Sequence, residues 1–208
     1  MAAKAANPSW LTISKDQKHL FVVNENGPGQ EDPVGRVSSY SIDPQNHQLT
    51  LINQVQSLGN EPTHSSLSVD ASHLFVSNYS VVEDPGGTLA VLPVGADGKL
   101  KPVVQMSAHP ASRVNLERQA SNHVHSTVSS PDGRYVFSND LGADKVFVYL
   151  FDPKAIPDLP LPAHEVICRK AHRIAAKTGA CWSRICADST MPAGCKRPTK
   201  ATMMAAKP

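Results

Sequence analysis

Two histidines lie two residues apart in the middle of the chain, and an arginine precedes them. His123 and His125 would point to the same side if they lie on a β-strand, because side chains alternate along a strand. An imidazole can accept a proton near neutral pH, and Arg118, five residues before His123, can bind an anionic group. The pattern is typical of general-base chemistry on an anionic substrate. The alternative is that His125 only hydrogen-bonds a neighbouring backbone.

The segment that carries Arg118 is too long for a hairpin turn. Residues 108–122 also contain His109, Arg113 and Glu117. Long loops on a rigid scaffold often carry function. We therefore treat His109, together with Arg118, as a candidate for substrate binding.

Other chemistry-bearing residue types do not form a recognisable site. The four cysteines are separated by 13, 5 and 9 residues and lack the close pairs of zinc sites: Cys168, Cys181, Cys186 and Cys195. Gly86 and Gly87 are followed by neither Lys-Ser/Thr nor a helical pattern, so they indicate a turn. The basic residues lack interleaved aromatic residues. We expect no metal, no cofactor and no nucleic-acid partner.

The elements that must position these residues are marked by a repeat. A Ser-x-Asp sequence recurs at Ser14, Ser68 and Ser130, each time followed by three residues, an apolar run and a side-chain amide or carboxylate. Short polar side chains of this kind form tight turns. The apolar runs end at Asn24, Asn78 and Asp140, which are 54 and 62 residues apart. We interpret these three polar residues as structural caps of the following turns.

Each unit predicts an antiparallel meander. The apolar runs are short and rich in β-branched and aromatic residues, as in buried strands. Second strands are predicted at residues 37–42, 88–92 and 145–151, and third strands at residues 49–56 and 100–106. Units of about 50 residues with several strands are typical of propeller blades. A two-sheet sandwich is the alternative.

The chain changes character after residue 153. Residues 1–153 have a net charge of −5 and contain no cysteine, whereas residues 154–208 have a net charge of +7 and contain all four cysteines. We interpret residues 154–208 as a low-order tail, either from a shifted reading frame or as a disordered basic extension. No stretch approaches the ~20 apolar residues of a membrane span, so no membrane partner is expected. The N-terminus has no signal-peptide pattern, which favours the cytoplasm, or the periplasm if a leader is missing.

Several short motifs together resemble the lactonase family of seven-bladed β-propellers, which includes 6-phosphogluconolactonase-like and carboxymuconate-cyclase-like proteins. The most distinctive is the segment 115–126, which contains Glu117, Arg118, Gln119 and the histidine pair. Residues 7–11, 62–64, 77–79 and 140–144 follow the same family order. The resemblance covers about residues 7–153. It implies an all-β fold, here a β-propeller fragment of about three blades, with residues 154–208 as an unrelated tail.

The resemblance also implies a function and a site. By this resemblance, the candidates for the family's ligand-site residues are Arg118, His123 and His125, and with a weaker match Glu25 and His64. Glu25 or one of the histidine pair is expected to be the base and Arg118 the anion binder, although Glu25 after a strand also suits a turn carboxylate. The expected activity is hydrolysis of a small anionic sugar lactone; alternatives are cyclisation of a carboxylated muconate and non-catalytic binding. Because three blades leave the ring open, we expect little or no lactonase activity from the 208-residue chain. The sequence does not predict its oligomeric state.

Overall fold

The fold consists of three antiparallel sheets of four strands each. A computed structural model describes residues 3–80, 86–154, 160–161 and 168–169, and all regular structure in these residues is β. The first sheet comprises β1 (Pro8–Ile13), β2 (His19–Asn24), β3 (Arg36–Ile42) and β4 (Leu49–Gln56). The second comprises β5 (Pro62–Leu67), β6 (His73–Asn78), β7 (Thr88–Pro93) and β8 (Gln105–Ala108). The third comprises β9 (Val124–Ser129), β10 (Tyr135–Asp140), β11 (Lys145–Leu150) and β12 (Cys168–Arg169).

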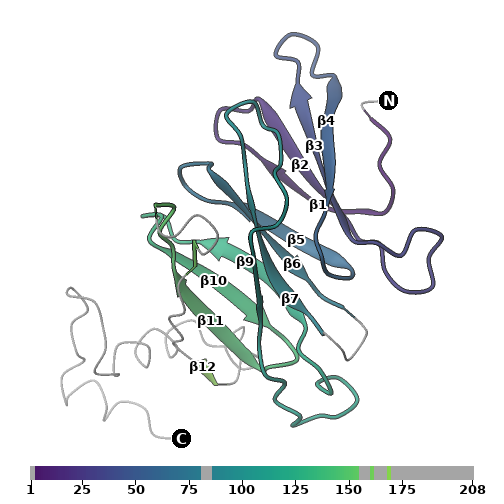
Figure 1. Ribbon diagram of the computed structural model, residues 1–208, viewed down its shortest axis with the longest axis vertical. Helices are drawn as coiled ribbons and strands as arrows, with labels where there is room; N and C mark the ends of the chain where they lie inside the picture. Colours follow the sequence, from purple (N-terminus) through teal and green to yellow (C-terminus); the bar gives the residue numbers. More distant parts are fainter. Residues whose placement is uncertain (1–2, 81–85, 155–159, 162–167, 170–208) are drawn as a thin grey trace, which may run out of the picture.

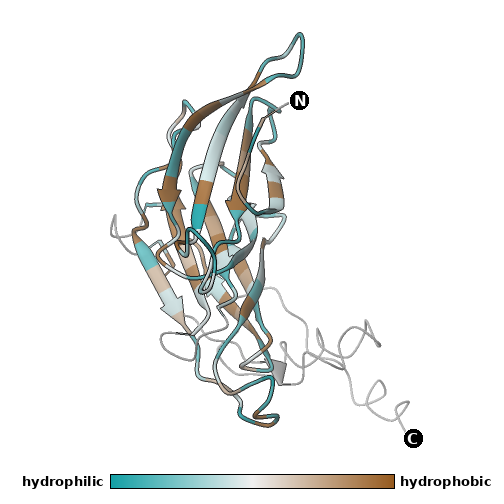
Figure 2. Cartoon of the chain, turned by 90° about the vertical axis from the view of Figure 1, so that its right-hand side faces the viewer, coloured by the Kyte–Doolittle hydropathy of each residue, from teal (hydrophilic) through white to brown (hydrophobic). Residues whose placement is uncertain are grey.

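The sheets stack in chain order, like consecutive blades (Figure 1). In each sheet the strands are hydrogen-bonded in sequence order, and the first strands β1, β5 and β9 pack side by side. They are the inner strands of three blades. The hydropathy colouring shows apolar residues on the strands and polar residues in the loops at both ends (Figure 2). The prediction of an all-β propeller fragment of three blades is confirmed.

The repeated Ser-x-Asp turns have the same geometry in all three blades. In each, the serine hydroxyl donates to the aspartate Oδ1, at 2.6, 2.6 and 2.5 Å for Ser14, Ser68 and Ser130. The serine Oγ then accepts the N–H of the first residue of the next strand, at 2.9 to 3.0 Å. These bonds set the start of β2, β6 and β10, so the turn chemistry predicted from the sequence fixes the strand register.

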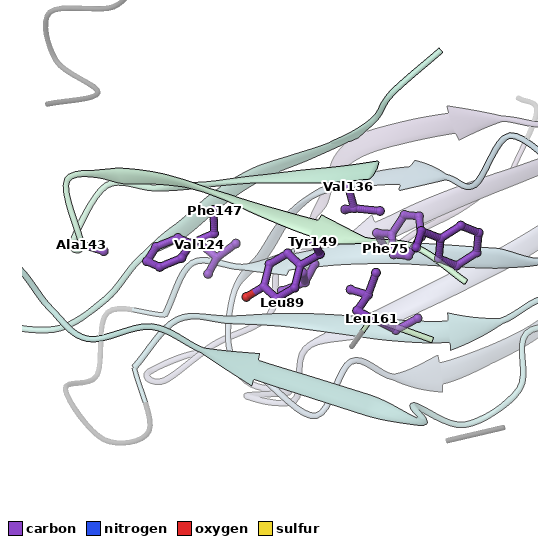
Figure 3. Packing of buried hydrophobic residues seen from close by; sticks show 10 residues of the cluster. Phe75, Leu89, Val124, Val136, Ala143, Phe147, Tyr149 and Leu161 are labelled. Atoms are coloured by element: carbon purple, nitrogen blue, oxygen red, sulfur yellow. The ribbon is translucent and has the colours of Figure 1, made fainter. Parts of the chain in front are cut away.

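The core lies between the blades. Phe21, Val23 and Val37 of the first blade pack against Leu74 and Leu92 of the second. The next interface joins Phe75, Leu89 and Val91 to blade 3, as Figure 3 shows for part of this cluster. Blade 2 therefore presents one apolar face to blade 1 and the other to blade 3, as its continuous apolar run predicted.

One predicted strand is misplaced. Residues 100–106 were expected to be a strand, but β8 begins only at Gln105, after a single bridge between Val94 and Leu100. Pro102 lies in the intervening stretch and cannot donate a backbone hydrogen bond to a ladder. The three inner strands had not been assigned at all.

Most of the predicted tail, residues 154–208, lies outside the described residues. Two of its described pieces contact the blades. Leu161 is buried in the core of blades 2 and 3, and its backbone N–H and carbonyl bond the side chain of Gln105 at 2.9 and 2.8 Å. The two-residue strand β12 pairs with β11. Within the described residues, no helix has the length and apolarity to cross a membrane.

Candidate functional site

A β-bulge begins each inner strand and sets the direction of the side chains there. In β1 the register shifts between Pro8 and Trp10, in β5 between Pro62 and His64, and in β9 opposite Asn139 and Asp140. The extra residues are Ser9, Thr63 and His125. A bulge re-aims side chains and is common beside functional sites. His125 therefore occupies the bulge position of the third blade, where it is exposed.

The bulges also link neighbouring blades. The Ser9 hydroxyl donates to the Pro62 carbonyl at 3.2 Å, and the Thr63 hydroxyl donates to the His125 carbonyl at 3.3 Å. These bonds hold the heads of the three inner strands together. Side chains from different blades consequently meet in this region.

His64, on β5, lies between the first and third blades. Its ring centroid is 4.3 Å from that of Trp10, which remains 43% exposed. Its Nδ1 accepts the backbone N–H of Thr127 at 3.4 Å, so in the neutral ring the proton is on Nε2. Burial, and then the charge of the neighbouring His125, lower the pKa of His64 below its ordinary value of 6.5. His64 is therefore a neutral hydrogen-bond donor at neutral pH.

Tyr79 brings the two histidines of the pair together. The His123 ring stacks on it with centroids 4.7 Å apart, and the His125 ring meets it edge-on at 6.0 Å. His123 Nδ1 contacts the carbonyls of Ser80 at 2.7 Å and Tyr79 at 3.2 Å. Because a carbonyl only accepts, Nδ1 carries a proton and His123 has a fixed orientation.

A buried network lies behind His123. The Asp140 carboxylate is 1% exposed, and its Oδ1 accepts the backbone N–H groups of His123 at 2.8 Å and Ala143 at 2.9 Å. Its Oδ2 is 2.7 Å from Nδ1 of His109, whose Nε2 is 2.6 Å from the Tyr149 hydroxyl. The interpretation of Asp140 as a structural cap fits these bonds, and its contact with His109 adds a feature that the sequence did not indicate.

Comparison with known proteins gives the family. The family model described as "Lactonase, 7-bladed beta-propeller" matches residues 1–163. The chain belongs to this lactonase family. Its matched region includes the three blades and the short stretch that contains the buried Leu161.

Individual relatives support the same family assignment. A 6-phosphogluconolactonase from Bacillus subtilis is 32% identical over 149 residues, which are 72% of this chain and 40% of that protein. A periplasmic gluconolactonase structure from Pseudomonas aeruginosa is 54% identical with a TM-score of 0.76, over 81% of this chain and 46% of the other. A 6-phosphogluconolactonase from Formosa agariphila is 29% identical over 84% of this chain and 45% of that protein. The chain thus spans less than half of the length of these relatives.

The structure places three of the six residues expected in the site near one another. His123 and His125 contact Tyr79, and His64, which stacks with Trp10, neighbours His125. Strand alternation does not set the directions of the two histidine side chains, because His123 precedes β9 and His125 lies on its bulge. The two rings nevertheless converge on Tyr79.

The other three expected residues are placed differently. His109 is buried, with both ring nitrogens bonded and its ring stacked on Phe147, so we do not include it in the site. Glu25 is half-buried after β2, at the blade position that Tyr79 occupies after β6, and its backbone N–H bonds the Asn7 carbonyl. Arg118 is exposed, and its side chain makes no hydrogen bond or ion pair with another described residue.

Trp10 and Tyr79 are the site residues that the sequence did not single out. Both occur within motifs that resemble the family, but neither was assigned a role. The signal for Tyr79 is its position directly after the repeated Asn at the end of a buried strand. No group of three or more His, Cys, Asp or Glu in the described residues is arranged to hold a metal ion.

Proposed function

We propose that this chain carries part of the active site of a sugar-lactone hydrolase, with His125 as the general base. The observation that carries the proposal is the placement of His125 on the bulge of β9. Its ring is exposed and makes no hydrogen bond to another described residue, while His64 and Tyr79 flank it. A base must reach a water molecule near the substrate, and this position allows it.

His64 has the complementary role. Its Nε2 carries the proton because Nδ1 accepts the Thr127 N–H. A neutral imidazole can donate this hydrogen to the oxygen that becomes negative when water attacks the lactone carbonyl. His64 is thus proposed as the oxyanion donor.

The reaction follows from these two roles. His125 takes a proton from water as the water oxygen bonds to the carbonyl carbon, and the negative oxygen accepts the bond from His64. The ring C–O bond then breaks, and the leaving ring oxygen receives the proton from His125. Lactone and water become the open hydroxy acid, with no other reactant.

The rest of the site is proposed from residue type. Trp10 is partly exposed beside His64 and offers an apolar surface to the face of a sugar ring. Arg118 would bind the carboxylate or phosphate of an anionic substrate, and Glu25 is the alternative base. The names of the relatives support both phosphorylated and unphosphorylated gluconolactones. The cytoplasm remains the predicted compartment, and the name of the Pseudomonas relative favours the periplasm.

The test is the rate of proton release from gluconolactone and from 6-phosphogluconolactone, corrected for the reaction in buffer. General-base and oxyanion groups typically contribute factors of about 10² to 10⁴ and 10² to 10³. We expect His125→Ala and His64→Ala to lose most of the rate above buffer, while His47→Ala, exposed in the β3–β4 turn, keeps it. Equal acceleration by the wild type and His125→Ala would refute the proposal, and so would a wild type that neither accelerates the reaction nor binds gluconate.

A further inference from the structure

Three hydroxyl groups lie between blades 2 and 3 without a protein partner. Ser77, Thr127 and Ser138 are completely buried, and none of their side-chain oxygens makes a hydrogen bond to another group of the described residues. An unpaired buried hydroxyl costs free energy, because the same group is hydrogen-bonded to water in the unfolded chain. Three of them in one core therefore require an explanation.

The strand registers place the three hydroxyls on the two sides of one interface. Ser77 pairs with Leu89 and Ser138 with Phe147, and both of these apolar residues belong to the core between blades 2 and 3. Thr127 pairs with Ser138 across β9 and β10. Paired residues of neighbouring strands share a face of the sheet. Ser77 therefore faces blade 3, and Thr127 and Ser138 face blade 2.

His64 brings the two sides to the same level of the interface. It pairs with Ser77 across β5 and β6, and its Nδ1 accepts the backbone N–H of Thr127 at 3.4 Å. The hydroxyl of blade 2 and the two hydroxyls of blade 3 consequently lie near one another, beside the inner strands. Ser77, Thr127 and Ser138 are called the hydroxyl cluster below.

The interface between blades 1 and 2 shows how the same positions are filled without polar groups. By the repeat, Val23 stands at the position of Ser77, and Val76 stands at the position of Ser138. Both valines are completely buried in the core between blades 1 and 2. A serine side chain is smaller than a valine side chain, so the interface between blades 2 and 3 has more space at these positions as well as hydroxyl groups.

We propose that the hydroxyl cluster binds an internal water molecule, which joins blades 2 and 3 next to His64. A buried water typically makes about three hydrogen bonds to polar groups that otherwise lack partners, and the cluster offers three hydroxyls. Each hydroxyl can donate or accept, so the water can use both of its hydrogens and a lone pair. Because Thr127 also donates its N–H to His64, this water stabilises the strand that fixes the His64 ring. The proposal does not depend on the hydrolase activity.

The direct test counts long-lived internal waters in solution by magnetic relaxation dispersion of the water oxygen nucleus. The wild type is compared with the double variant Ser77→Val/Ser138→Val, which has at both positions the residue of the interface between blades 1 and 2. Circular dichroism confirms that the double variant is folded. We expect the wild type to hold more long-lived waters than the double variant. Equal numbers in the two folded proteins would overturn the proposal.

Thr127→Val provides a second test, which applies even if the double variant does not fold. Valine has nearly the shape of threonine but no hydroxyl, so the sign of the change in stability shows whether the hydroxyl has a partner. Loss of a hydrogen bond to water lowers the urea midpoint, whereas removal of an unpaired hydroxyl raises it. Thr50→Val, at an exposed position of β4, measures the effect of the same exchange on a strand. We expect the midpoint of Thr127→Val to lie below that of Thr50→Val, and a midpoint equal to it or higher would overturn the proposal.

Discussion

Replacement of His109 by leucine should destabilise the protein more than replacement of its partner Asp140 by asparagine. The His109→Leu change keeps an apolar side chain against Phe147 but removes the side chain that, among the described residues, bonds Oδ2 of Asp140. Asp140→Asn keeps an oxygen that can accept the N–H groups of His123 and Ala143. The amide can also donate to Nδ1 of His109.

The magnitudes follow from burial. Asp140 is 1% exposed and His109 is 7% exposed, so water cannot replace the lost partner. Removal of one partner of a buried carboxylate–histidine pair typically lowers the free energy of unfolding by about 3 to 5 kcal/mol. For Asp140→Asn the exchange of hydrogen bonds should cost about 1 kcal/mol. Asn24 and Asn78 occupy the same position in the other blades, which shows that the blade fold accommodates an amide there.

Urea denaturation monitored by circular dichroism measures both free energies of unfolding. The double variant should lose less unfolding free energy than the two single variants lose together, because the leucine at position 109 then faces an amide and no longer a carboxylate. Phe147→Leu is a control for loss of packing beside the same network. If Asp140→Asn destabilises the protein as much as His109→Leu, the unpaired carboxylate is not the cause and the reasoning is refuted.

Three further predictions concern single groups. Hydrogen bonds from Ser14 and from the backbone lower the pKa of Asp16 below 3.8. The carboxylate therefore stabilises the folded state above pH 3.8, and this contribution is lost as the pH falls through the lowered pKa. Over this pH range the urea midpoint of Asp16→Asn should change less than the midpoint of the wild type. The ring of His64 should titrate below pH 6.5 by NMR, and an ordinary pKa would contradict its burial. Because the unfolded chain then binds this proton more readily than the folded protein, the free energy of unfolding should fall as the pH decreases from 6.5 to the lowered pKa. Gly142→Ala should cost about 1 to 3 kcal/mol, because its Cβ would lie 2.7 Å from Asn122 Cα; unchanged stability would show that the loop yields.

The sequence predicted the middle strands of each blade because their signals are local. Ser14, Ser68 and Ser130 mark the turns, and the apolar runs that follow in blades 1 and 2 are buried on both faces. The inner strands carry no such signal: β5 reads Pro-Thr-His-Ser-Ser-Leu and is half-buried in most of its length. It pairs with β6 and packs beside the inner strands β1 and β9 of the other blades, which are distant in the sequence, and no local sequence pattern predicts this packing.

The site was predicted in part for the same reason. The spacing of His123 and His125 indicated the segment in which both rings contact Tyr79, but a bulge is a property of pairing between strands and cannot be read from alternation. The contact of His64 with Trp10 joins two blades. His109 illustrates the opposite case, because a histidine in a long loop suggested function and the structure shows it in the core with both nitrogens bonded.

The proposed site lies on the inner strands of blades 2 and 3, where we expect a sugar acid or its lactone to bind beside His64 and His125. The most direct measurement is an NMR titration of the histidine rings with gluconate, the stable product of the proposed reaction. We expect saturable changes in the chemical shifts of the His64 and His125 rings, and no change for the exposed His47 ring. Shifts confined to His47, or no saturable shift in any ring, would contradict it.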